Sequence, residues 1–284
     1  MAEKARMIDV SKCIGCRACQ VACKHWNQLP AAQTEFTGSY ENPPDLLPET
    51  WSRIMFREHE NGDEVKWHFC FNSCMHCEDP ACLPVCPVDA IFKTELASVN
   101  IDQETCIACG LCVTACPFDI PRIAGPLAEV NDVEFEQPEE AIQVGMKNAS
   151  WKCTFCYDRI SNGLSTACAK ACPTGTITFG DQEEKLQEAE NRVADLQDLG
   201  YGNPQIYGKE EVGGTHVYYV LEDDPDTYGL PADPQVSLTT YFWNVALRPV
   251  KTLAAIGLAV GFMNNFINKK AEEKNTKGQK EMVE

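Results

Sequence analysis

The sequence predicts an α+β protein made of two small cysteine-rich modules related by duplication, followed by an extension and a single C-terminal transmembrane helix. Three observations lead to this fold class. Sixteen of the 17 cysteines fall into four motifs of four. Two of these motifs share the same spacing and similar flanking residues. Residues 252–268, close to the C-terminus, carry no charged side chain.

Length and composition limit the possible functions. A chain of 284 residues has room for about two domains with real hydrophobic cores, so the cysteines do not replace a missing core. The net charge of −18 argues against nucleic acid as a partner, because phosphate backbones require clustered Lys and Arg. The N-terminal sequence MAEKARMIDVSKC lacks the apolar segment of a secretory signal, and the odd number of cysteines fits a disulfide framework poorly.

The cysteine motifs have closely related spacings. The first and third read C-x2-C-x2-C-x3-C, the second C-x2-C-x4-C-x3-C-P and the fourth C-x2-C-x11-C-x3-C-P, and a proline also follows the third. Their members are Cys13, Cys16, Cys19, Cys23; Cys74, Cys77, Cys82, Cys86; Cys106, Cys109, Cys112, Cys116; and Cys153, Cys156, Cys168, Cys172. The repeated unit is predicted to be a strand, a cysteine loop, a short helix, a Cys-Pro turn and another strand.

This spacing suits iron–sulfur chemistry. Three thiolates on one tight loop can bind three irons of a [4Fe–4S] cluster, while the fourth cysteine, one helical turn further on, binds the other cluster of a pair. The following proline ends the helix. We therefore predict two bacterial-ferredoxin-like modules with four [4Fe–4S] clusters, bound by all sixteen motif cysteines. Structural zinc, which prefers two separated C-x2-C pairs, and disulfides both fit the motifs badly.

Three residues beside the motifs have two interpretations each. Cys70 is predicted to be a buried free thiol rather than a ligand. His76, between two cysteines of the second motif, is predicted to support the ligands rather than bind metal. Lys152, directly before Cys153, either tunes a cluster electrostatically or is simply solvated.

The C-terminal part is predicted to hold a helix, a strand and a membrane anchor. The helix covers residues 181–199, with a capping box from Asp181 and Glu184, and Gly200 ends it. The strand covers residues 215–221. The uncharged segment 252–268 follows aromatic residues and precedes several lysines, which places the C-terminus in the cytoplasm and the cysteine-rich body on the periplasmic side.

Several longer stretches resemble one known family. They are CIGCRACQVACKHWN, CMHCEDPACL, CPFDIPR, KCTFCYDRI, ACPTGTITFG and EVGGTHVYYVL. Together they resemble the four-cluster electron-transfer subunits of molybdenum or tungsten oxidoreductases, and they look most like the β subunit of membrane-bound respiratory formate dehydrogenase. The likeness runs from about residue 8 to the C-terminal segment.

The resemblance implies how the motifs pair. One module would combine motifs one and four, and the other would combine motifs two and three. The implied ligand sets are Cys13, Cys16, Cys19 with Cys172; Cys153, Cys156, Cys168 with Cys23; Cys74, Cys77, Cys82 with Cys116; and Cys106, Cys109, Cys112 with Cys86. Electrons would pass from a molybdopterin catalytic α subunit through the first, fourth, second and third motifs to a membrane cytochrome b-type γ subunit.

The chain divides accordingly. Residues 1–69 and 127–180 form the first module, 70–126 the second, 181–239 the extension, 240–270 the anchor and 271–284 a charged tail. Within them, residues 127–150 contain an acidic insertion. The chain is expected to be non-catalytic and to bind no small-molecule substrate of its own. The alternatives are an equivalent subunit of a polysulfide, thiosulfate or sulfoxide reductase, or a free polyferredoxin-like carrier.

Overall fold

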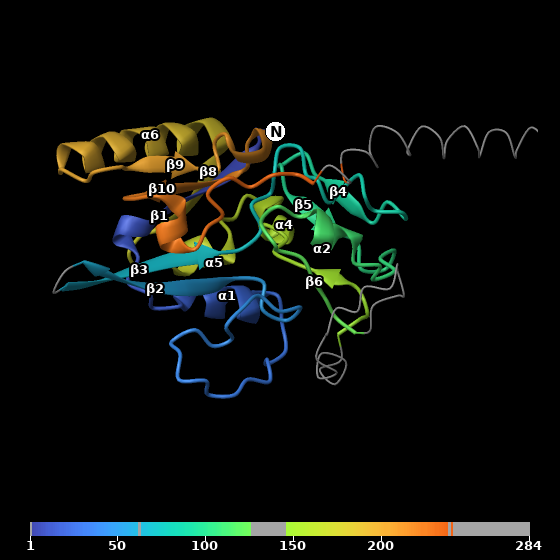
Figure 1. Ribbon diagram of the computed structural model, residues 1–284. Helices are drawn as coiled ribbons and strands as arrows, with labels where there is room; N and C mark the ends of the chain where they lie inside the picture. The colour runs from blue at the N-terminus through green and yellow to red at the C-terminus, as the bar shows by residue number, and fades with distance from the viewer. Residues whose placement is uncertain (1, 62–63, 126–145, 238–239, 241–284) are drawn as a thin grey trace, which may run out of the picture. The chain divides into compact units, whose positions relative to one another are not determined.

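A four-stranded sheet connects distant parts of the sequence. The structure is a computed structural model that describes residues 2–61, 64–125, 146–237 and 240. The strand order of the sheet is β8 (Ile177–Asp181), β1 (Lys4–Asp9), β10 (Val217–Leu221) and β9 (Gln205–Tyr207). β1 pairs antiparallel with β8 and parallel with β10 (Figure 1). The sheet therefore joins the start of the first motif, the end of the fourth and the C-terminal extension.

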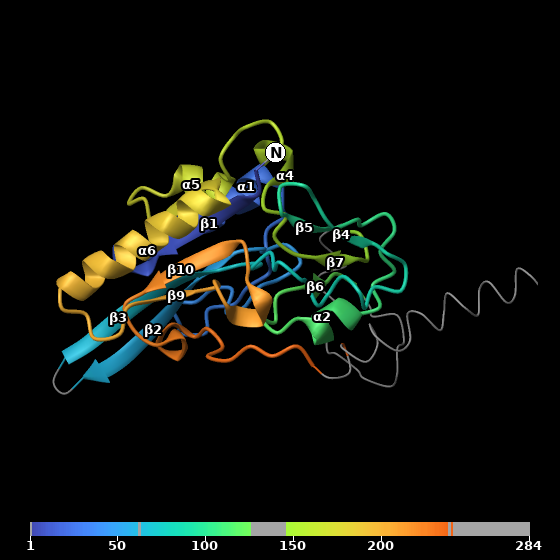
Figure 2. The ribbon, with the colours of Figure 1, turned by 90° about the horizontal axis from the view of Figure 1, so that it is seen from above.

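Helix α6 (Gln182–Asp198) lies along one face of this sheet (Figures 1 and 2). Its Ala189 and Leu196 are buried against Met7 and Val220 of the sheet. The predicted helix is confirmed within one residue at each end, but the predicted capping box does not form. Asp181 is the N-cap without a side-chain cap bond, because its carboxylate binds the ammonium of Lys4 instead.

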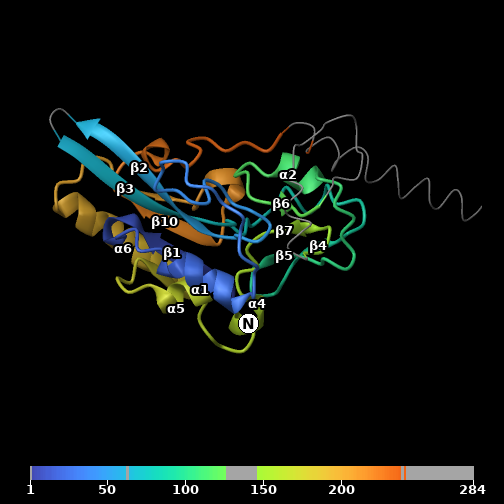
Figure 3. The same ribbon diagram turned by 90° about the horizontal axis from the view of Figure 1, so that it is seen from below.

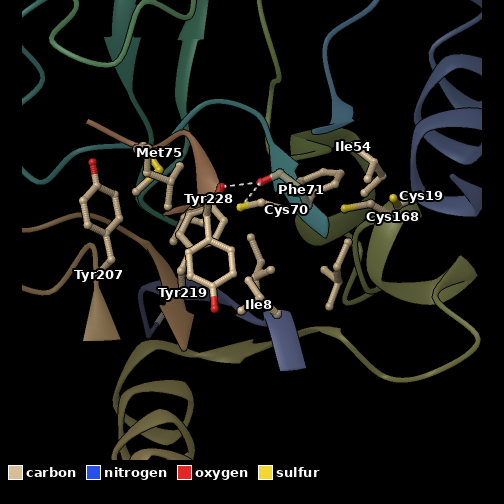
Figure 4. Close-up of a cluster of buried hydrophobic side chains, with 14 of the residues drawn as sticks. Ile8, Cys19, Ile54, Cys70, Phe71, Met75, Cys168, Tyr207, Tyr219 and Tyr228 are labelled. Atoms are coloured by element: carbon tan, nitrogen blue, oxygen red, sulfur yellow. Dashed lines mark hydrogen bonds between the residues drawn. The ribbon is translucent and has the colours of Figure 1, made fainter. Parts of the chain in front are cut away.

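The other face of the sheet carries the larger core. Ile8 and Tyr219 from the sheet meet Phe71 there, and the Tyr219 hydroxyl donates to the Phe71 carbonyl at 2.8 Å (Figure 4). Phe71 belongs to a hairpin of β2 (Arg53–Asn61) and β3 (Glu64–Asn72), shown in Figure 3. The hairpin is absent from the sequence predictions.

The second module is built from short elements. A hairpin joins β4 (Ile91–Lys93) to β5 (Val99–Ile101), and β6 (Arg122–Ile123) pairs with β7 (Ser150–Trp151). β7 lies in the range 127–180 that the sequence assigns to the first module, yet its partner strand lies in the second. The two modules are thus more interwoven than consecutive ranges imply.

The predicted Cys-Pro turns explain where the short helices end. α2 (Leu111–Ala115) and α5 (Ala167–Ala171) stop at a C-cap cysteine that precedes a proline, whereas α1 (Ala18–Trp26), with no such proline, continues past Cys23. The second motif differs from the predicted unit: residues 81–85 form turns rather than a helix, because Pro84 provides no N–H. The remaining elements are α4 (Tyr157–Ile160), η1 (Val10–Lys12), η2 (Glu211–Gly213) and η3 (Pro225–Tyr228).

No helix in the described ranges is long and apolar enough to cross a membrane. The predicted anchor at 240–270, apart from residue 240, and the charged tail lie outside the described residues, as does most of the acidic insertion at 127–150.

A fully buried carboxylate at the end of β1 connects this strand to helix α6. Asp9 accepts a hydrogen bond from Arg192 Nε of α6 at 2.8 Å and lies 3.0 Å from Lys12 Nζ. We expect Asp9→Asn to lower the free energy of unfolding by about 1.5–3 kcal/mol, because a charge-assisted bond is lost. Asp195→Asn is the matched control, since Asp195 is exposed and its carboxylate lies as far as 4.0 Å from the same arginine. Denaturant unfolding should show a loss below about 1 kcal/mol for the control; equal losses would contradict a special role for the buried pair.

Candidate iron–sulfur sites

The first cavity of interest lies between the first motif and the Cys-Pro turn of the fourth. Its volume is about 310 Å³, and apolar side chains of Ile54, Phe71 and Ile177 line it. The cysteines that line it are Cys13, Cys16, Cys19 and Cys172. Three cysteines of one loop and one distant cysteine thus share one largely apolar cavity.

A second cavity of about 320 Å³ repeats this arrangement in the other module. Ile91 and Ile101 supply its apolar lining, and Ser150 of β7 also reaches it. Its cysteines are Cys86, Cys106, Cys109 and Cys112. This cavity, too, combines three cysteines of one motif with one cysteine of another.

Two further cysteine groups are recognised by their mutual electrostatic effects. Burial raises the pKa of Cys23 well above its ordinary value, and the thiolates of Cys153, Cys168 and Cys156 raise it further. Burial likewise raises the pKa of Cys82; Lys152 opposes this, and the thiolates of Cys116, Cys74 and Cys77 add to it. Cys23 therefore lies near three cysteines of the fourth motif, and Cys82 lies near Cys116 and two further cysteines of its own motif. These neighbours agree with the two remaining predicted ligand sets, whose role in binding clusters remains a prediction.

The four loops share one backbone feature. The residue just before the second cysteine of each motif has a positive φ: Gly15, His76, Ala108 and Phe155. At Gly15 a side chain would also come within 3.1–3.2 Å of Phe69 and Phe56, so glycine is required there for two reasons. This left-handed residue turns its amide back toward the first cysteine. The N–H of Phe155 lies 3.4 Å from Cys153 Sγ, and that of Ala108 lies 3.5 Å from Cys106 Sγ.

These groups fit an iron–sulfur cluster on chemical grounds. Burial, and after it the neighbouring thiolates, raises the pKa values of Cys19, Cys23 and Cys82, so these thiolates need bound cationic metal to stay deprotonated together. Amide N–H groups directed at sulfur stabilise the negative charge of a thiolate-bound cluster. Ala90 and Ser150 provide two more such amides, to Cys86 Sγ at 3.2 Å and to Cys106 Sγ at 3.3 Å. Ser150 is absent from the sequence predictions, because it is the last residue of the range 127–150 that contains the acidic insertion.

The residues with two interpretations can now be placed. Cys70 is 1% exposed, and its thiol donates to the Phe71 carbonyl, so its predicted burial is confirmed. His76 is fully buried, and its Nδ1 accepts from the Val99 N–H at 3.0 Å. Lys152 is 4% exposed, so the solvated interpretation is wrong. Arg6, equally buried on β1, contacts Cys168 Sγ at 3.5 Å and was missed, because a single arginine in a short strand resembles a surface residue.

Comparisons with known proteins agree with this chemistry. A family described as "4Fe-4S dicluster domain" matches residues 12–90, and a second family with that description matches residues 65–138 and 129–182. Together these matches cover all four cysteine motifs entirely.

Comparison with whole proteins also points to iron–sulfur subunits. The chain is 42% identical to the nitrate-inducible formate dehydrogenase iron–sulfur subunit of Escherichia coli, over 94% of this chain and 85% of that protein. It is 42% identical to the formate dehydrogenase iron–sulfur subunit of Haemophilus influenzae, over 93% and 80%. It is 32% identical to formate dehydrogenase 2 subunit beta (cytochrome c-553) of Nitratidesulfovibrio vulgaris, over 79% and 96%. The chain therefore belongs to the formate dehydrogenase iron–sulfur subunits and binds multiple [4Fe–4S] clusters.

Proposed function

We propose that this chain is a non-catalytic electron-transfer subunit that carries electrons from a molybdopterin formate dehydrogenase subunit to a membrane cytochrome b-type subunit. The observation that carries the proposal is the pair of similar cavities, each lined by three cysteines of one motif and one of another. A bound [4Fe–4S] cluster supplies a one-electron redox couple. The surrounding residues hold the thiolates, direct amides at sulfur and exclude water.

We propose four clusters, one for each cysteine group. Their ligand sets are Cys13, Cys16, Cys19, Cys172; Cys153, Cys156, Cys168, Cys23; Cys74, Cys77, Cys82, Cys116; and Cys106, Cys109, Cys112, Cys86. Electrons cross from the first module to the second between two of these clusters, the one bound by the Cys153 set and the one bound by the Cys74 set. Support comes from the buried neighbourhood of Cys153, whose pKa is raised by burial and further by the nearby thiolate of Cys74, with Arg6 opposing.

The sequence supports a location for the chain at the membrane. The uncharged segment 252–268 anchors the chain, with the cluster-binding body on the periplasmic side and the C-terminus in the cytoplasm. One relative carries cytochrome c-553 in its name, so a soluble cytochrome is the second candidate acceptor.

The test uses the intact complex, purified with its native partners. We expect formate to reduce the clusters within the complex, which EPR spectroscopy detects as new iron–sulfur signals. Their re-oxidation by a quinone analogue, but not by an added c-type cytochrome, would identify the membrane acceptor. The formate assignment fails if formate leaves the spectrum unchanged while polysulfide, thiosulfate or a sulfoxide re-oxidises dithionite-reduced clusters. Isolation of the full chain as a soluble monomer with four clusters and no partner would instead support a free carrier.

A further inference from the structure

Two buried cations lie between cysteine groups of different modules. Arg6 on β1 is 1% exposed, and Lys152, which follows β7, is 4% exposed. Buried cations of this kind normally pair with carboxylates. Across the described part of the chain, neither of them forms an ion pair with a carboxylate. Their surroundings instead point to the cysteines as the source of negative charge.

Arg6 reaches both sides of the boundary. Its guanidinium donates to Cys168 Sγ at 3.5 Å, in the fourth motif, and to the carbonyl of Cys74 at 3.4 Å, in the second. Ser73 Oγ accepts a third bond at 2.6 Å. The rings of Phe71 and Phe155 lie 5.0 and 5.4 Å from the guanidinium carbon and exclude water.

Arg6 carries a fixed positive charge, because a guanidinium is not deprotonated in proteins. Its hydrogen bond to Cys168 Sγ places that charge beside the fourth motif.

Lys152 is the counterpart of Arg6 on the side of the second motif. Its ammonium donates to the carbonyls of Val99 and Cys153, the latter at 3.2 Å. Its ammonium also bonds the Cys74 side chain, and the thiolates of Cys74 and Cys82 act on it more strongly than that of Cys153. Two cysteines of the second motif are therefore its main electrostatic partners.

His76 lies in the same region but adds no charge. Its ring stacks on Phe155 with 4.4 Å between centroids, and Nδ1 already accepts the Val99 N–H. Burial, Lys152 and Arg6 hold its pKa well below the ordinary value. The junction therefore contains two fixed positive charges and a neutral imidazole.

We propose that Arg6 and Lys152 are positioning residues that raise the reduction potentials of the two clusters facing each other across the module boundary. The inference rests on the proposed function and adds that each of the two cations sets the potential of a different cluster. One-electron reduction adds one negative charge to a cluster and its thiolates, with no bond or proton transferred. A fixed cation a few ångströms away, in a water-excluded site, stabilises that charge, and cluster potentials depend on such charges and hydrogen bonds. Arg6 acts mainly on the fourth-motif cluster, and Lys152 mainly on the second-motif cluster.

The experiment is an EPR-monitored redox titration of the purified complex with dithionite and chemical mediators. We expect Arg6→Met to lower the midpoint potential of one cluster, and Lys152→Met to lower that of a different cluster. Each shift should be at least about tenfold in the one-electron equilibrium constant, which is about 59 mV. The remaining potentials should stay unchanged. Arg6→Lys keeps the charge, so it should retain most of the wild-type potential.

Lys170→Met is the matched control, because Lys170 is exposed on α5 only two residues after Cys168. Iron analysis comes first; where Arg6→Met loses a cluster, Arg6→Lys and Lys152→Met decide the outcome. The proposal is overturned if intact Lys152→Met or Arg6→Met complexes titrate like the wild type, or if Lys170→Met shifts a potential as much. It is also overturned for Arg6 if Arg6→Lys behaves like Arg6→Met. Because dithionite is the reductant, the result does not depend on whether formate is the physiological donor.

Discussion

Replacing Cys19 with alanine is expected to remove one whole cluster, about four iron atoms per chain, and to reduce electron transfer from formate to the background level. Cys19 is buried and lines the cavity of the first motif with three other cysteines. With three thiolates left, a cubane loses the ligand of one iron, and the chain of electron carriers is interrupted at its first step. Iron analysis and EPR spectroscopy of the purified complex measure the loss directly.

Cys70→Ala is the natural control for this experiment. Cys70 belongs to the same hydrophobic core as Cys19 and is more deeply buried, but it lines neither cysteine cavity. The variant should keep its full iron content and formate-dependent reduction, with a loss of about 1 kcal/mol in stability from the deleted thiol. An iron loss in Cys70→Ala as large as in Cys19→Ala would show that core damage, rather than ligation, explains both.

The second large effect concerns the packing of α6 on the sheet. Leu196 is 1% exposed and packs with Ala189, Tyr218 and Val220. We expect Leu196→Ala to destabilise the protein by about 2–5 kcal/mol, from the lost burial and the cavity left behind. Thermal unfolding of the complex should show this as a lower melting temperature.

Leu199→Ala tests whether position, rather than residue type, matters. Leu199 is the C-cap of the same helix and is 69% exposed, so its replacement should change stability by no more than about 0.5 kcal/mol. A destabilisation of Leu199→Ala equal to that of Leu196→Ala would contradict the assignment of the buried face.

Local chemistry made much of this protein predictable from its sequence. The cysteine spacings predict tight loops, and prolines after Cys116 and Cys172 predict where α2 and α5 end. Helical periodicity predicts α6 because its buried positions, such as Ala189 and Leu196, are seven residues apart. These features depend on residues close together in the chain.

Features that depend on distant neighbours could not be predicted in the same way. Asp181 has the sequence context of a capping residue, but Lys4, far away in sequence, binds its carboxylate. Arg6 looks like an ordinary surface cation until β1 is flanked by two strands and covered on both faces. Strand β10 has weak alternation because all five of its residues are buried, which is typical of a strand covered on both sides.

The parallel pairing of β1 with β10 also has a consequence for biosynthesis. Arg6 is opposite Val217, so the first strand to leave the ribosome finds its parallel partner only when nearly all of the described chain has been made. Pairing across such a separation is slow to form. The antiparallel partner β8 is available earlier, because it ends at Asp181. A chain that stops before residue 217 therefore leaves the sheet without its parallel strand.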